Sequence, residues 1–153
     1  MSKPNIFFLT IDSLRADKLY GSSKTSVTPN LNSIMKNSVY FSQAISSADQ
    51  TGTSLASIFT AQFPATTGLT HFNFSSQTET YFNTFKQNGY YLCGFFPDHG
   101  FFKNLTENFD DKSLYVYDKI ENWKNLYGGI GDSILKKINL LHNHEPWIFS
   151  VHI

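Results

Sequence analysis

Two segments of the sequence place polar side chains where a folded domain could use them for chemistry. In the first, Asp12 directly follows residues 6–11, a continuous apolar run typical of a strand that is buried on both faces. A carboxylate at the end of such a strand can bind a hard divalent cation through oxygen. It can equally form a turn or cap a helix, and the residue types leave both interpretations of Asp12 open.

The second segment carries hydroxyl groups just before a helical pattern. Thr51, Thr53 and Ser54 precede apolar residues that recur at helical spacing. The N-terminus of a helix attracts anions, and a hydroxyl there can act as the nucleophile on a phosphate or sulfate ester. The alternative is that one of these hydroxyls only caps the helix.

Strands and helices are predicted to alternate along the chain. The strands are apolar rather than alternating, which predicts an α/β domain with a mainly parallel sheet. Ligands of such sheets bind at the carboxyl ends of the strands. That rule directs attention to Asp12, to residues 97–100 and to the end of the last strand at His152. The predicted strands are 6–11, 39–45, 90–96 and 147–153, the predicted helices are 30–36, 54–63, 78–88 and 130–141, and 98–128 is predicted to be irregular.

The composition excludes several classes of protein. The 12 Lys and Arg residues balance the 12 Asp and Glu residues, so the chain lacks the basic patch of a nucleic-acid-binding protein. A single cysteine, Cys93, excludes an internal disulfide and a multi-cysteine zinc site. No run of 18 apolar residues and no signal peptide is visible, so we expect no membrane segment and a cytoplasmic location.

Taken together, the two segments resemble the sulfatase family of the alkaline phosphatase superfamily. Residues 4–17 are similar to the family's opening, in which a proline and an asparagine precede a hydrophobic strand and the pattern Asp-(Asp/Ser)-Leu-Arg-x-Asp. Residues 51–64 match the family's nucleophile segment without a gap. Further landmarks follow in the family's order: Thr28-Pro29-Asn30-Leu31, Val39-Tyr40-Phe41-Ser42-Gln43-Ala44, Asn88-Gly89-Tyr90 and Pro146-Trp147-Ile148-Phe149-Ser150-Val151-His152.

The resemblance implies a fold, a reaction and a set of site residues. The fold would be a three-layer α/β/α sandwich of the alkaline phosphatase type. Asp12 would be a metal ligand, Thr51 would be both the nucleophile and a metal ligand, and His152 would lie in the catalytic site. The cofactor would be one divalent cation (Ca, Mg, Mn or Zn). The substrate would be a phosphate or sulfate ester, either a small molecule or one linked to a glycan or lipid.

Several departures from the family pattern bear on the reaction. Thr51 cannot mature to formylglycine, which requires cysteine or serine, so a phosphate ester and a covalent threonine–phosphoryl intermediate are favoured. Leu55 stands where the family has an arginine beside the nucleophile, and Ser13 replaces the second aspartate of the metal-binding pair. Thr53 and Thr67 replace a proline and a histidine. These losses favour the main alternative, a catalytically silent domain with a binding or structural role.

Four histidines and one aspartate complete the candidates. Asp98 and His99 follow a predicted strand and could line the site, although a surface loop is the simpler interpretation. His71 follows the nucleophile helix and could contact substrate, or it could be an ordinary loop histidine. His142 and His144 lie at the end of a helix, where cationic side chains suit the helix dipole, which indicates a structural role.

The landmarks also lead to an expectation about domain organisation. Residues 1–153 correspond to the N-terminal portion of a sulfatase-like domain, and the family's second set of metal ligands lies further along. We therefore expect this portion to be inactive alone, with an unpaired sheet edge and exposed apolar helix faces.

Overall fold

The computed structural model describes residues 2–22, 24–116 and 129–153. They form two compact units. The larger unit comprises Met1–Thr10 and Ser47–Ile153, and the smaller unit comprises Ile11–Ser46.

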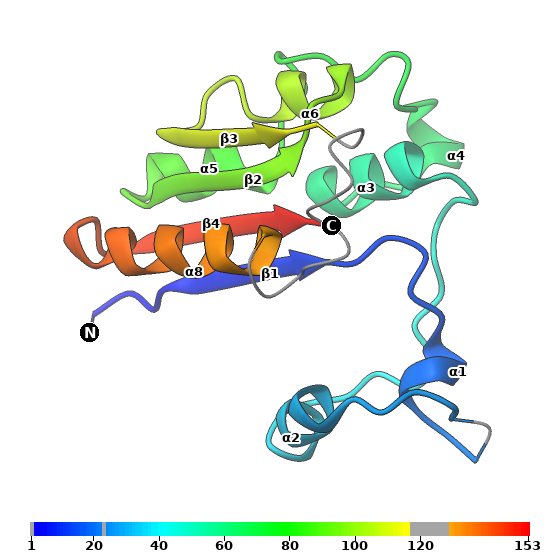
Figure 1. Ribbon diagram of the computed structural model, residues 1–153. Coiled ribbons are helices and arrows are strands. Elements are labelled where there is room, and N and C mark those ends of the chain that lie inside the picture. Colours follow the sequence, from blue (N-terminus) through cyan, green and yellow to red (C-terminus); the bar gives the residue numbers. More distant parts are fainter. Residues whose placement is uncertain (1, 23, 117–128) are drawn as a thin grey trace. The chain divides into compact units, whose positions relative to one another are not determined.

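Four parallel strands form the sheet of the larger unit (Figure 1), in the order β1-β4-β2-β3. They are β1 (Ile6–Thr10), β2 (Tyr91–Pro97), β3 (Asp111–Tyr115) and β4 (Trp147–His152). β4 comes last in the sequence but lies between β1 and β2. Because all four strands run in the same direction, their carboxyl ends lie at one edge of the sheet. The predicted parallel α/β sheet is therefore confirmed.

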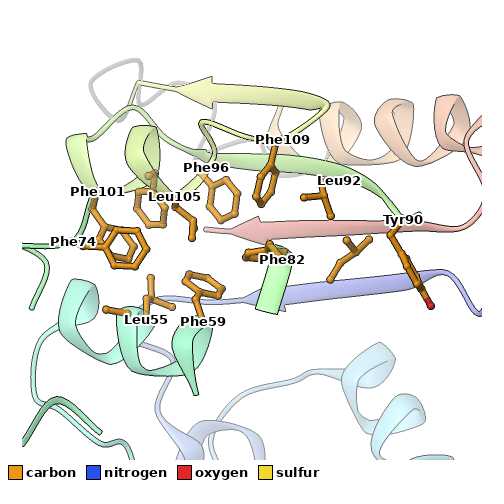
Figure 2. Close-up of a cluster of buried hydrophobic side chains, with 13 residues drawn as sticks. Leu55, Phe59, Phe74, Phe82, Tyr90, Leu92, Phe96, Phe101, Leu105 and Phe109 are labelled. Carbon is orange, nitrogen blue, oxygen red and sulfur yellow. The ribbon is translucent and has the colours of Figure 1, made fainter. Parts of the chain in front are cut away.

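Helices cover both faces of this sheet (Figure 1). On one face, α3 (Thr51–Thr60), α5 (Tyr81–Gln87) and α6 (Gly100–Leu105) supply most of the side chains of a large aromatic core (Figure 2). Phe59 and Phe96 are fully buried there. The core residues are Leu55, Ala56, Phe59, Phe74, Phe82, Tyr90, Leu92, Phe96, Phe101, Phe102, Leu105, Phe109 and Ile148.

The opposite face is covered by α8 (Ile130–Leu140) and the short 3-10 helix η1 (Leu141–Asn143). Ile130 and Leu141 pack there on Cys93 of β2 and on Phe149 and Val151 of β4. Both central strands are thus buried on both faces, and the predicted three-layer α/β/α arrangement is confirmed. The larger unit also contains α4, a single turn over Pro64–Thr67. Within the described ranges, no helix has the length and apolar character needed to cross a bilayer.

The structure corrects three expectations about elements. Residues 6–11 were expected to be buried on both faces, but β1 is an edge strand whose Phe7 and Leu9 remain 44% and 41% exposed. Residues 39–45 form no strand, because their apolar side chains are exposed and their backbone joins none of the four paired strands. The segment predicted to be irregular contains α6 and β3, and its residues 117–128 lie outside the described part of the chain.

The smaller unit contains α1 (Ala16–Leu19) and α2 (Pro29–Lys36). Pro29 is the first residue of α2, where its missing N–H costs nothing. The described residues of this unit include no buried side chain. Polar contacts and the paired rings of Tyr20 and Tyr40, 4.8 Å apart, link its segments instead.

Candidate functional site at the carboxyl edge of the sheet

His152 is the last residue of β4 and is buried, with 3% of its surface exposed. Its Nδ1 lies 2.9 Å from Oγ1 of Thr10, the last residue of β1. The hydroxyl of Tyr115, at the end of β3, donates a hydrogen bond of 2.9 Å to the His152 carbonyl. The ring of Phe102 packs 5.1 Å from the imidazole. Three strand ends and α6 therefore fix this histidine at the edge where ligands of parallel sheets bind.

Thr51 is the first residue of α3 and is exposed. The N-cap position belongs to Gln50, whose carbonyl accepts the N–H of Ser54 at 2.8 Å and whose side chain makes no capping hydrogen bond. The N-cap residue is therefore Gln50 rather than Thr51, Thr53 or Ser54. Thr51 instead stands at the positive end of a ten-residue helix.

His71 comes close to the same end of α3. A Cβ built on Gly52 would lie 2.4 Å from Cβ of His71, so the two residues pack in a contact that only glycine permits. The Nδ1 of His71 is buried and has no hydrogen-bond partner among the described residues. The ring of Phe72 lies 3.8 Å from the imidazole. Sequence reasoning named His71 as a possible substrate contact or an ordinary loop histidine. It did not predict the packing on Gly52, because nothing in a 19-residue separation signals this contact.

Asp98 and His99 follow the carboxyl end of β2, but their contacts are structural. His99 is the N-cap of α6, and its Nδ1 accepts the N–H of Phe101 at 3.3 Å. The Asp98 carboxylate lies 2.6 Å from Nζ of Lys103. These contacts support the simpler interpretation, in which this pair shapes a loop and the start of a helix.

Asp12 belongs to the smaller unit and is exposed. The next residue, Ser13, has a φ of 56°, a left-handed conformation that a non-glycine residue adopts only rarely. Nearby, Arg15 holds Asp17 through two hydrogen bonds of 2.9 and 3.0 Å. Hydrogen bonding to Arg15 holds the pKa of the Asp17 carboxyl below its usual range, and the same contact raises the pKa of Arg15.

The predicted metal ligands fit a hard cation in kind but not in number. Asp12 and Thr51 would both offer oxygen, which suits Ca²⁺ or Mg²⁺. Six or more ligands are usual for these ions. Among the described residues, no three His, Cys, Asp or Glu side chains gather into a possible metal site. These two residues do not complete a cation site by themselves.

The remaining candidates, His142, His144 and Cys93, make structural contacts or are buried. The ring of His144 stacks on Tyr91 at the start of β2, 4.1 Å away, and His142 lies within η1. Burial raises the pKa of the Cys93 thiol to about 12, so this thiol is a packing group.

Comparison with known proteins gives one result. A model of the Sulfatase family matches residues 4–153, which is nearly the whole chain. No match was found among curated proteins or among solved structures. The parallel sheet, the helices on its two faces and this match together show that the chain belongs to the Sulfatase family.

Proposed function

We propose that this sulfatase-family chain provides the nucleophile of an ester hydrolase or transferase, and that the nucleophile is Thr51. The observation that carries the proposal is the place of Thr51, which is exposed and is the first residue of α3. The resemblance of residues 51–64 to the family's nucleophile segment supports the same role. The helix dipole and the N–H groups of the first turn favour negative charge on a phosphate or sulfate bound at that helix end.

The proposed reaction has two steps. In the first, Oγ1 of Thr51 attacks phosphorus or sulfur, the Thr51 proton passes to a base, and the bond to the ester oxygen breaks as the alcohol leaves with a proton. In the second, water or an acceptor alcohol attacks the Thr51 ester and restores the free hydroxyl. Phosphate esters are the favoured substrates, because threonine cannot be converted into the formylglycine of classical sulfatases.

Two further residues belong to the proposal. His152 is the catalytic-site histidine, held at the carboxyl edge by Thr10 and Tyr115. Members of the family generally use a divalent metal, which lowers the barrier by stabilising the nucleophile and the charged oxygens. We assign Asp12 and Thr51 as two of its oxygen ligands; the ion could be Ca, Mg, Mn or Zn.

One observation favours a second function, a catalytically silent domain. Leu55, which stands at the position of the family's arginine beside the nucleophile, is 5% exposed and belongs to the aromatic core. Position 55 therefore supplies no cation beside Thr51, where the resemblance implies one. A silent domain would bind an ester or a protein without turning it over.

The test is turnover of bis(p-nitrophenyl) phosphate and p-nitrophenyl sulfate by the full-length protein, with each divalent cation and with EDTA. Thr51→Ala is expected to lower turnover by about a thousandfold or more, because the covalent step is lost. Thr60→Ala is the matched control, since Thr60 is at the other end of α3 and its hydroxyl bonds only its own helix at Ala56. Intact-mass spectrometry after mixing should show a phosphoryl adduct on Thr51. Unchanged turnover in Thr51→Ala would show that Thr51 is not the nucleophile, whereas no turnover with any cation would support the silent alternative.

An ordinary sulfatase predicts a different result. Thr51→Cys, produced together with a formylglycine-generating enzyme, would then gain activity on the sulfate ester. We expect no such gain, because Leu55 and Thr53 disrupt the segment that this enzyme must recognise.

A further inference from the structure

The side chains of Thr10 and His152 meet on the face of the sheet that carries the aromatic core. Side chains alternate between the two faces of a strand, so Thr10 points the same way as Ile6 and Phe8, which pack against that core. His152 likewise points the same way as Ile148, a member of the core. The paired strands β1 and β4 thus place a hydroxyl and an imidazole nitrogen 2.9 Å apart at the carboxyl edge.

The Thr10 hydroxyl has two polar neighbours and only one proton. Its Oγ1 lies 3.1 Å from the carbonyl oxygen of Val151 and 2.9 Å from Nδ1 of His152. A carbonyl oxygen can only accept a hydrogen bond, so the contact with Val151 takes the Thr10 proton. The Thr10 oxygen then offers only lone pairs to Nδ1, and the imidazole must donate there. In a neutral ring one nitrogen is the donor and the other the acceptor, so Nε2 carries the lone pair.

Further contacts hold the imidazole in this arrangement. The His152 carbonyl accepts the hydroxyl of Tyr115 at 2.9 Å, and the ring of Phe102 packs 5.1 Å away at an angle of 31°. His152 is 3% exposed, so water cannot readily replace the hydrogen bond to Thr10. The opposite tautomer would draw the Thr10 proton to Nδ1 and leave two oxygen atoms facing each other at 3.1 Å without a proton between them.

We infer that Thr10 is a positioning residue that holds neutral His152 with its proton on Nδ1, so that His152 serves the catalytic site as a base through Nε2. The inference rests on the proposed function, which places His152 in that site, and it gives the histidine a defined role. Nε2 takes the proton of an attacking hydroxyl as the new bond to phosphorus or sulfur forms, and it returns this proton to the oxygen that leaves. Throughout this exchange Nδ1 keeps its own proton in the hydrogen bond to Thr10.

The first test reads the tautomer directly, by long-range ¹H–¹⁵N NMR of the histidine side chains in the full-length protein at a pH where the rings are neutral. His152→Asn identifies the His152 signals by their loss. We expect a protonated Nδ1 and an unprotonated Nε2 in wild type. Thr10→Val keeps the shape of threonine without its hydroxyl and should move the proton to Nε2, whereas Thr10→Ser should keep the wild-type pattern. A protonated Nε2 in the neutral wild-type ring, or the same tautomer in Thr10→Val as in wild type, would overturn the inference.

Turnover of bis(p-nitrophenyl) phosphate tests what the tautomer does. Thr10→Val should lower kcat by about tenfold or more and change KM by less than about twofold, because the base is lost while ester binding is kept. Thr10→Ser should keep kcat within about threefold of wild type, since serine supplies the same hydroxyl. Thermal unfolding of both variants controls for stability. An unchanged kcat in Thr10→Val with an altered tautomer would show that His152 is not the base, and equal losses in both variants would indicate a packing role alone.

The outcomes separate the two proposals. If Thr51→Ala keeps full turnover while Thr10→Val alters the His152 tautomer and lowers kcat, the nucleophile is wrong and the role of Thr10 stands. If Thr51→Ala loses turnover while the His152 tautomer is the same with and without the Thr10 hydroxyl, the nucleophile stands and the role of Thr10 is wrong. If the full-length protein turns over neither ester, the role of His152 as a base is wrong together with the proposed function.

Discussion

The two compact units of this chain are stabilised in different ways. The larger unit has buried cores on both faces of its sheet, whereas the described residues of Ile11–Ser46 include no buried side chain. The proposed nucleophile Thr51 and the proposed catalytic His152 belong to the first unit, and the proposed metal ligand Asp12 belongs to the second. Removing apolar atoms should therefore destabilise the first unit strongly and the second hardly at all. The predictions that follow test this difference.

The largest effect is expected in the aromatic core. Phe59→Ala removes a fully buried ring that contacts Phe8, Tyr81 and Phe82, and it should lower the free energy of unfolding by about 3–5 kcal/mol. The matched control in the smaller unit is Phe41→Ala, a ring that is 75% exposed, with an expected change within about 0.5 kcal/mol. Urea unfolding followed by circular dichroism measures both. Similar losses in the two variants would show that the smaller unit is also held by a core.

A smaller effect is expected where α3 begins. Gly52→Ala introduces a Cβ that cannot coexist with Cβ of His71, so either the loop or the helix must move, at a cost of about 1–3 kcal/mol. Gly100→Ala is the control, since Gly100 begins α6 and a Cβ there would meet nothing within 4 Å. Because alanine favours helix, this control should be neutral or stabilising by up to about 1 kcal/mol. Thermal unfolding of the two variants distinguishes close packing from a general cost of replacing glycine.

Cys93 provides a probe of the larger unit alone. Its thiol is fully buried in β2, and burial raises its pKa to about 12, so native protein at pH 8 should react with iodoacetamide far more slowly than unfolded protein. Mass spectrometry of samples quenched over time, in buffer and in urea, measures the difference. Complete labelling in buffer at the rate seen in urea would show that the sheet opens readily.

The smallest effect is expected at the surface of the smaller unit. The pKa of Asp17 lies below its usual range because Arg15 hydrogen-bonds the carboxylate, so this pair stabilises the fold above the pKa of the unfolded chain. That stabilisation is lost as the pH falls through the lower, folded pKa. A ¹³C NMR titration should show the depressed value in wild type and a value in the usual range for Arg15→Gln. High salt should shift the wild-type value upward, since both side chains are exposed. A titration identical in wild type and variant would show that the pair does not form in solution.

The sequence was most informative where apolar periodicity was strong. It predicted the positions of β1, β2, β4, α2, α3, α5 and α8 to within a few residues, because the apolar residues of these strands form short runs and those of the helices recur at helical spacing. β3 escaped prediction because Asp111–Tyr115 has no apolar run and becomes a strand by pairing with β2 at the sheet edge. Residues 39–45 show the opposite error: their apolar residues predicted a strand, but no strand forms there. An apolar segment becomes a strand only when it pairs with another strand.

The site was predictable only in part. The hydroxyls in the first turn of α3 and the histidine at the end of β4 could be singled out from the sequence because each lies at the end of a recognisable element. The contact of His71 with Gly52 was not, because it depends on the path of the loop that follows α3, which no local pattern encodes. The bond between Thr10 and His152 likewise depends on strand order, which brings together two residues 142 positions apart.

That strand order also has a consequence for synthesis on the ribosome. In the described sheet β1 has one neighbour, β4, which emerges 142 residues after it. At typical elongation rates this is a delay of roughly 7–28 s. Throughout that time β4, the neighbour of β1 in the described sheet, has not been synthesised. The nascent chain therefore exposes an apolar, aggregation-prone segment near its N-terminus that chaperones can bind. The insertion of β4 between β1 and β2 thus means that the described sheet cannot close before β4 has been synthesised.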